Sequence, residues 1–320
     1  MAEQKHQPDQ SDEDLELYQD EEGGDDTGGS QNEDTRVQLA SGEALSPAEV
    51  DRFLRWKPAT FVAIVGDKDS GKSTIMCAIY DRLLRGPFSG LGFARSRTLV
   101  ALERRAHYSR VESGRATPDT PRTSILEDLH YFHLGLVGDD GPPTDVLISD
   151  RAGEVYRDAR SDTRLVETLS ELYQADRLVV LIDGRRANDP MERANALHVT
   201  RQSLRAFLDG GALGRDSVVQ VVTTKMDLIM GSAEEEATTR AIAEFEERLL
   251  RDFGPRLAEL TFWRIAARDP SGTFQPAHGI GELLTDWVRP KTDQVAEPAP
   301  KFLLTSEFDR LLVRTHYGEN

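Results

Sequence analysis

Thiol groups are almost absent from this sequence. Its 320 residues include one cysteine, Cys77. A single cysteine excludes an internal disulfide, and the lack of a second thiol excludes the common cysteine-rich metal sites as well. The composition therefore predicts a reducing compartment, and we expect Cys77 to serve as a packing residue on a helix.

Long apolar runs are also missing. Apolar residues make up 38% of the chain and charged residues 30%, and no stretch approaches the roughly 20 apolar residues that a membrane span requires. The segment from Met1 to Gln10 has no basic region followed by an apolar stretch, so a secretory signal is not expected. We expect no membrane span and a cytoplasmic location.

Positive charge is scarce at the start of the chain. Residues 1–40 contain 13 Asp and Glu residues against Lys5 and Arg36, a net charge of −11, which leaves −6 of the total −17 for the other 280 residues. With almost no apolar side chains, this region cannot bury enough surface to offset the entropy of ordering. We predict a disordered acidic tail over residues 1–42, either a solubilising arm or a regulated docking arm, and no direct binding of nucleic acid.

Short segments flank a central domain. Residues 43–59 are expected to form a lead-in helix, because Ser46 can act as N-cap, Pro47 suits the first helical position and Glu49 occupies the capping-box position. Residues 290–320 read as a proline-containing linker followed by a short apolar segment. We expect that segment to dock on its own domain or on a partner.

Between these segments, residues 60–289 alternate between apolar runs and amphipathic stretches, which is typical of an α/β domain. The connection over residues 138–143 is too short for a parallel crossover, so the strands on either side of it should form an antiparallel hairpin. We predict a three-layer fold with a six-stranded, mostly parallel sheet, one antiparallel hairpin strand and helices on both faces. The expected strands are 61–65, 129–137, 145–149, 177–183, 218–223 and 260–266, and the expected helices are 74–84, 163–175, 191–208, 233–252 and 281–288.

A phosphate-binding loop follows the first strand. Residues 66–73 match the Gly-x-x-x-x-Gly-Lys-Ser pattern and open a predicted helix. In such a loop the backbone N–H groups surround a phosphate, Lys72 bridges the β- and γ-phosphates, and the Ser73 hydroxyl ligates Mg²⁺. The predicted nucleotide-binding residues here are Gly66, Asp67, Lys68, Asp69, Ser70, Gly71, Lys72, Ser73 and Thr74.

A second motif lies at the end of the strand 145–149. Asp150 and Gly153 form an Asp-x-x-Gly turn that is followed by Glu154. The Asp150 carboxylate can hold Mg²⁺ through water, and the Gly153 N–H can meet a γ-phosphate. Loss of that phosphate would release the turn, so this segment is a candidate switch.

A third motif points to guanine as the base. Thr224, Lys225 and Asp227 follow the buried strand 218–223 directly. The Asp227 carboxylate can accept hydrogen bonds from guanine N1–H and N2–H₂, which adenine cannot offer, while Lys225 lays its aliphatic stem along the base. Backbone N–H groups of Ala266 and Ala267, after the last strand, are candidates to contact the guanine oxygen.

With these motifs in this order, the chain resembles P-loop GTPases of the translation-factor/Ras-like superclass over about residues 60–289. More narrowly, residues 96–99, 121–123, 129–130 and 150–154 look like the bacterial double-GTPase family. The resemblance implies GTP/GDP and Mg²⁺ as ligands, slow hydrolysis of GTP, and a protein effector or second GTPase as partner. It also implies a place in a bacterial multigene conflict or defence system.

The same resemblance suggests further site residues. Switch I should supply a threonine ligand to Mg²⁺, and Thr123 is favoured over Thr120. Glu154 stands where many small GTPases carry the glutamine that orients water, which suggests slow hydrolysis. Thr224 stands where asparagine is commoner, a variant also seen in dynamin-like GTPases. Asp69 stands where potassium-activated relatives place a cation-binding asparagine or serine, so we hypothesise that it helps to hold K⁺.

The segment 86–121 is rich in arginine and could deliver a guanidinium to the phosphates in cis, although a solvated basic face is the alternative. Its arginines include Arg95, Arg97, Arg104, Arg105, Arg110 and Arg115. Two other readings of the whole chain stay open from the residues themselves: a P-loop ATPase or kinase, and a nucleotide-binding scaffold that does not hydrolyse.

Overall fold

The computed structural model describes residues 41–109, 129–138, 141–268 and 272–289, and all statements below concern these residues. The acidic tail, the candidate switch I residues Thr120 and Thr123, and the C-terminal apolar segment lie outside them. No helix among the described residues is long and apolar enough to cross a membrane.

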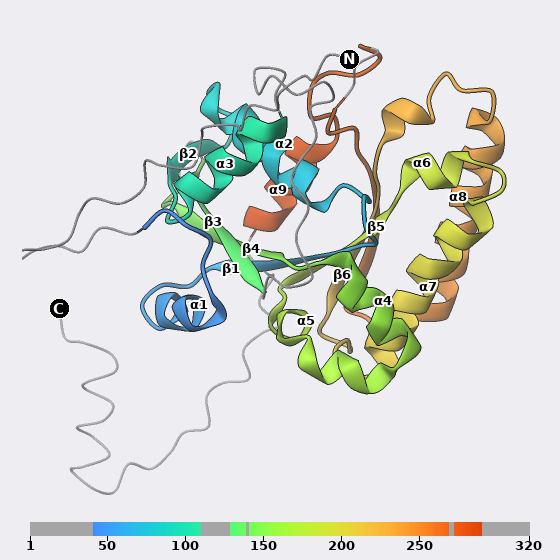
Figure 1. The fold of residues 1–320 in the computed structure, drawn as a ribbon, viewed down its shortest axis with the longest axis horizontal. Helices are drawn as coiled ribbons and strands as arrows, with labels where there is room; N and C mark the ends of the chain where they lie inside the picture. Colours follow the sequence, from blue (N-terminus) through green and yellow to red (C-terminus); the bar gives the residue numbers. More distant parts are fainter. Residues whose placement is uncertain (1–40, 110–128, 139–140, 269–271, 290–320) are drawn as a thin grey trace, which may run out of the picture. The chain divides into compact units, whose positions relative to one another are not determined.

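The described residues form a seven-stranded sheet in the order β2-β3-β4-β1-β5-β6-β7 (Figure 1). Strand β3 is antiparallel to β2 and to β4, and the other pairings are parallel. The predicted hairpin strand is therefore confirmed. The strands are β1 (Thr60–Val65), β2 (Gly92–Arg95), β3 (His130–Val137), β4 (Thr144–Asp150), β5 (Arg177–Ile182), β6 (Val218–Thr223) and β7 (Glu259–Arg264).

The predicted strand count of six was wrong, because β2 was missed. This edge strand has four residues, it is partly exposed, and its pairing with β3 shifts register between Phe93 and Arg95. A short edge strand that begins with glycine and ends with arginine lacks the buried apolar pattern by which the other strands were found.

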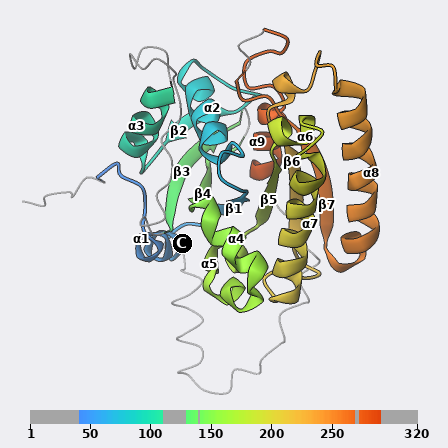
Figure 2. The ribbon, with the colours of Figure 1, turned by 45° about the vertical axis from the view of Figure 1, so that its right-hand side comes forward.

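Helices cover both faces of the sheet, as predicted (Figures 1 and 2). Helices α2 (Lys72–Leu84), α3 (Leu99–Ser109) and α9 (Ile280–Val288) pack with Val62 and Ile64 in one core cluster, which includes the buried thiol of Cys77. The neighbouring residues Ala63 and Val65 point to the opposite face and pack in a second cluster. That face carries α4 (Gly153–Ser161), α5 (Ser170–Gln174), α6 (Gly184–Asn188), α7 (Arg193–Asp209) and α8 (Glu235–Phe253).

Several helices differ from the prediction. The segment 163–175 forms a 3₁₀ helix, η2 (Thr163–Thr168), followed by the short helix α5, because the chain turns at Leu169 between them. Helices α3, α4 and α6 were not predicted. Helix α4 is strongly polar and buries few side chains, among them Tyr156 and Ala159, so its apolar periodicity is weak in sequence.

The lead-in segment belongs to the same core as the sheet. Helix α1 (Pro47–Leu54) has the predicted capping box: the Glu49 carboxylate accepts hydrogen bonds from the N–H and the hydroxyl of Ser46, both at 2.8 Å. These bonds lower the pKa of Glu49. Val50 and Phe53 of this helix are buried in a third cluster, against Phe61, Leu129, Tyr131 and Leu147 of the sheet.

Candidate functional site

The predicted phosphate loop connects β1 to α2 at the carboxyl edge of the parallel strands (Figure 2). The loop needs two left-handed residues. Gly71 has φ 106°, a conformation that favours glycine, and Asp69 has φ 63°, which aspartate tolerates better than most residues. Lys72 and Ser73 then begin α2, so both side chains lie at the helix N-terminus, where the helix dipole favours anions.

Lys72 is folded onto the loop that precedes it. Its ammonium donates to the carbonyl oxygens of Gly66 at 2.8 Å and Asp67 at 3.1 Å. Burial lowers the pKa of Lys72, and the nearby carboxylates of Asp150, Asp67, Glu154 and Asp69 offset part of that effect. The ammonium thus lies inside the loop, where four carboxylates attract it electrostatically.

The Asp-x-x-Gly turn lies directly against this loop. Gly153 begins α4, and a Cβ atom built on it would lie 2.7 Å from the Gly66 carbonyl oxygen and 2.8 Å from the Lys68 nitrogen. Both neighbours are backbone atoms, so only a residue without a Cβ allows this approach. Glu154 follows, half-buried in the first turn of α4. The structure therefore brings the first two predicted motifs together.

Ser73 and Asp150, the two described residues predicted to hold Mg²⁺, share one cation. The guanidinium of Arg105 lies 3.4 Å from the Ser73 hydroxyl and 2.7 Å from the Asp150 carboxylate. Two hard oxygens close enough to meet one positive group suit Mg²⁺, which takes one or two protein oxygens and completes its shell with phosphate and water. Within the described residues no cluster of three His, Cys, Asp or Glu side chains could hold a metal.

The third motif is tied to the phosphate loop by two hydrogen bonds. The Thr224 hydroxyl donates to the Ser70 carbonyl oxygen at 2.9 Å, and the Lys225 ammonium donates to the Asp69 carbonyl oxygen at 2.7 Å. Lys225 also forms an ion pair with Asp183 at 2.9 Å. Threonine in place of the commoner asparagine thus still has a polar group that joins β6 to the loop.

The remaining predicted base contacts are placed at the same edge. Asp227 lies half-buried on η3 (Met226–Leu228), just after Lys225, whose backbone is left-handed with φ 55°. The Ala266 N–H donates to the His278 carbonyl oxygen at 3.1 Å. The contact of the Ala266 and Ala267 N–H groups with the guanine oxygen stays a prediction.

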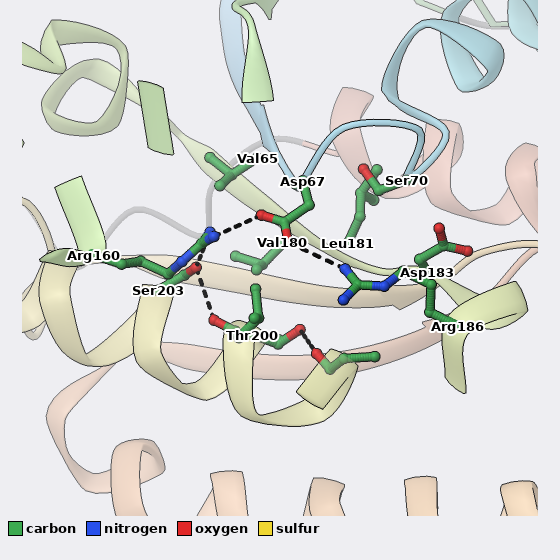
Figure 3. Close-up of a pocket in the computed structure, with 13 residues that line it drawn as sticks. Val65, Asp67, Ser70, Arg160, Val180, Leu181, Asp183, Arg186, Thr200 and Ser203 are labelled. Carbon is green, nitrogen blue, oxygen red and sulfur yellow. Dashed lines mark hydrogen bonds and ion pairs between the residues drawn. The ribbon is translucent and has the colours of Figure 1, made fainter. Parts of the chain in front are cut away.

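Asp67 has a role that the sequence did not indicate. Its carboxylate contacts Arg160 of α4 at 2.8 Å and Arg186 of α6 at 3.3 Å (Figure 3). These three residues line a pocket beside the loop, together with the buried Ser70, whose hydroxyl has no hydrogen-bond partner among the described residues. A polar pocket of this kind suits ordered water. Asp67 therefore connects the loop to two helices.

Sequence reasoning did not single out four residues that contact predicted site residues in the structure: Asp183, Arg105, Arg160 and Arg186. Asp183 could have been found, because it is a polar residue directly after the buried strand β5, as Asp150 is after β4. The arginines carried no such positional signal, since they lie within helices among many other arginines. Lys68 and Asp69 are exposed, and the role of Asp69 in binding K⁺ stays a prediction.

The family described as Double-GTPase 2 has a model that matches residues 60–288, which is more than half of the chain. No curated protein matches the chain.

Three solved structures with a similar fold share no more than 15% sequence identity with the chain. One is the Methanosarcina barkeri Roco2 RocCORdC structure bound to GDP, with 15% identity, TM-score 0.34, and coverage of 72% of this chain and 50% of that one. Another is the S. cerevisiae Ski7 GTPase-like domain bound to GDP and inorganic phosphate, with 14% identity, TM-score 0.40, and coverage of 76% and 53%. The mammalian SRP receptor structure has 13% identity, TM-score 0.39, and coverage of 71% and 98%. The chain thus spans about half the length of the first two.

Proposed function

Because the chain belongs to the Double-GTPase 2 family, we propose that it is a Mg²⁺-dependent guanine-nucleotide-binding switch that hydrolyses GTP slowly to GDP and phosphate. The observation that carries the proposal is the bonding of Thr224 and Lys225 to the backbone of the phosphate loop at 2.9 and 2.7 Å. Because the proposed base-reading motif is hydrogen-bonded to the phosphate loop, one nucleotide could reach both segments, with its base at the motif and its phosphates at the loop.

The phosphates would meet three groups of this chain. The loop and the start of α2 provide backbone N–H groups and a helix dipole. Lys72 would exchange its carbonyl partners in the loop for phosphate oxygens. Mg²⁺, when bound to Ser73 and Asp150, neutralises charge on the phosphates, and Thr123 or Thr120 is proposed as its switch I ligand. The Gly153 N–H would donate to the γ-phosphate, which couples α4 to the presence of that phosphate.

Glu154, the residue after Gly153, is the basis for the proposed slow hydrolysis of GTP. A glutamine at this position can both donate to and accept from an attacking water, whereas an ionised Glu154 can only accept. Glu154 would also place a negative charge near the phosphates. We expect single-turnover GTP hydrolysis that is slow without a partner, and Glu154→Gln should accelerate it. Tight GTP binding with no phosphate release in either protein would favour the non-hydrolysing scaffold.

Base selection is proposed to depend on Asp227. An aspartate carboxylate accepts from guanine N1–H and N2–H₂, and an asparagine can instead donate to the C2 carbonyl of xanthine. We therefore expect GTP, but not ATP, to displace labelled GDP from the wild type, and Asp227→Asn should prefer xanthosine triphosphate over GTP. Displacement by ATP equal to that by GTP would favour the ATPase or kinase alternative and refute the proposal.

Signalling is proposed to pass through protein partners, either an effector or a second GTPase, within a bacterial multigene conflict or defence system. The family name supports a pair of GTPases, and the contacts between Gly153 and the loop support a nucleotide-dependent α4. A pull-down from the native cell, comparing the wild type with Ser73→Asn, tests this. Partners that are recovered equally with both proteins would count against a switch.

A further inference from the structure

Arg105 occupies an unusual place for an arginine in a nucleotide site. One guanidinium bridges the Ser73 hydroxyl at 3.4 Å and the Asp150 carboxylate at 2.7 Å. These are the two described residues that are proposed to hold Mg²⁺. The arginine thus uses the same oxygens that the metal requires.

Burial explains why a cation is needed at this position. The Asp150 side chain is 1% exposed, and an ionised carboxylate buried without a partner carries a large desolvation cost. Arg105 supplies the compensating charge from within the chain. Its side chain is 18% exposed, so the pair is largely shielded from solvent and from salt.

The position of Arg105 is supported from two sides. Its guanidinium lies 5.0 Å from the centroid of the Phe132 ring, a cation–π contact with strand β3. Helix α3 also buries Leu102 and Ala106 in the core that it shares with α2. The neighbouring Arg104 points elsewhere and forms a bidentate pair with Glu43 at 2.8 and 3.0 Å. The two adjacent arginines therefore differ sharply in what they contact.

We propose that Arg105 is the built-in counter-cation of the magnesium position, and that it competes with Mg²⁺ for Ser73 and Asp150. The inference rests on the proposed function, since it concerns how the same site binds GDP. Two consequences follow. Without metal, Arg105 keeps Asp150 neutralised, so GDP can still bind. With metal, the Arg105 guanidinium must leave these oxygens, which weakens the apparent affinity for Mg²⁺.

The test measures binding of a fluorescent N-methylanthraniloyl GDP, first in EDTA and then in a Mg²⁺ titration, with Mn²⁺ binding followed by electron paramagnetic resonance. Arg105→Gln and Arg105→Ala are compared with the wild type, and Arg104→Ala is the matched control on the same helix. Arg105→Lys retains the charge without the two-pronged geometry. Circular dichroism and thermal unfolding establish that each variant is folded.

Loss of Arg105 should weaken GDP binding in EDTA and strengthen metal binding in the Mg²⁺ and Mn²⁺ titrations. In EDTA, the affinity of Arg105→Gln for GDP should fall by about tenfold or more, which is the scale of one charge-assisted hydrogen bond, because the Asp150 carboxylate loses the Arg105 guanidinium. In the titration, the Mg²⁺ and Mn²⁺ concentrations for half-saturation should fall by a similar factor, because the competitor has gone. Arg105→Lys should give intermediate values, and Arg104→Ala should match the wild type.

The outcomes separate this inference from the proposed function. Wild-type protein that binds no guanine nucleotide with or without metal would overturn both. GDP binding that is intact in the wild type, with the same metal dependence in a folded Arg105→Gln as in the wild type, would overturn the role of Arg105 and leave the GTPase proposal standing. If Arg105→Ala does not fold, Arg105→Gln, which keeps the length and polarity of the side chain, decides the question.

Discussion

The ammonium of Lys225 donates to the carbonyl oxygen of Asp69 at 2.7 Å, across 156 positions of sequence. This bond joins the segment proposed to read the base to the loop proposed to hold the phosphates. The two segments follow different strands, β6 and β1, so their contact depends on the order of strands in the sheet.

Lys225→Met should test that bond, because methionine keeps an unbranched apolar stem and loses the ammonium. We expect the affinity for GDP to fall about tenfold and the free energy of unfolding to fall by about 1 kcal/mol, the typical net value of such a hydrogen bond. Fluorescent GDP binding and urea unfolding measure the two effects. Lys57→Met, at an exposed lysine after α1, is the control, and equal behaviour of the two variants would contradict the prediction.

Asp67→Ala should destabilise the protein even without nucleotide. The change leaves Arg160, whose side chain is 7% exposed, and Arg186 without their shared carboxylate. Removing one partner of a partly buried ion pair of this kind should cost about 1–3 kcal/mol in urea unfolding. Asp252→Ala breaks an exposed pair with Arg201 and should cost within about 0.5 kcal/mol. A cost for Asp67→Ala no larger than that of the control would rule out the linking role.

Gly153→Ala should separate the Asp-x-x-Gly turn from the phosphate loop. The added Cβ would meet loop backbone at 2.7–2.8 Å, so the loop or α4 must shift, at a cost of about 1–3 kcal/mol. GDP affinity should fall at least about tenfold in the same variant. Gly254 has helical dihedral angles and open space around its Cβ position, so Gly254→Ala should be neutral or stabilising. Wild-type binding and stability in Gly153→Ala would refute the contact.

Asp69 gives a prediction about monovalent ions. If its carboxylate helps to hold K⁺ beside the phosphates, GTP turnover should be faster in KCl than in NaCl at equal ionic strength. Asp69→Gly removes the carboxylate, and glycine tolerates the left-handed backbone of φ 63°. This variant should show equal rates in the two salts. Equal rates in the wild type itself would remove the hypothesis.

His133 gives a prediction about pH. Burial lowers the pKa of this histidine, although its hydrogen bond with Asp145 at 2.9 Å acts in the opposite direction. Its Nδ1 accepts the Arg97 N–H at 3.0 Å, so the ring is neutral when folded. A lowered folded pKa means that the unfolded chain binds the extra proton first. The stability contributed by His133 is therefore fully present above about pH 6.5 and declines as the pH falls toward the folded pKa.

Thermal and urea unfolding between pH 7.5 and 5.5 measure this effect, whose slope is at most about 1.4 kcal/mol per pH unit for one proton. His133→Asn should be less stable than the wild type at pH 7.5 and should lose less stability on acidification. An unchanged slope in that variant would show that other groups cause the pH dependence.

Much of the fold could be predicted because its signals are local. Buried strands such as Val218–Thr223 are short apolar runs, and the capping box of Ser46 and Glu49 lies within one helical turn. The edge strand Gly92–Arg95 could not be predicted in this way. It is identified by its hydrogen bonds to β3 and not by its own composition.

The features of the candidate site also fall into two groups, those that are local in sequence and those that depend on packing. The phosphate loop, the Asp-x-x-Gly turn and the base-reading segment were found from spacing, because each motif is contiguous and follows a strand. Their convergence depends on the order of the strands in the sheet, and the contacts of Gly153 and Lys225 with the loop show it. The guanine contact of Ala266 stays a prediction, and in this structure its N–H donates to the His278 carbonyl oxygen across a loop.

Local sequence patterns predict where the backbone bends and which helix begins at the carboxyl edge of the strands. They also identify the side chains that are candidates to contact phosphate, metal and base. These properties depend on residues that are neighbours in the chain. The tertiary structure alone decided that Arg105, among the arginines of its segment, meets Ser73 and Asp150, and that Asp67 joins two helices. Charged side chains of different elements meet only when those elements pack together. Such a pairing leaves no periodic signal in the sequence.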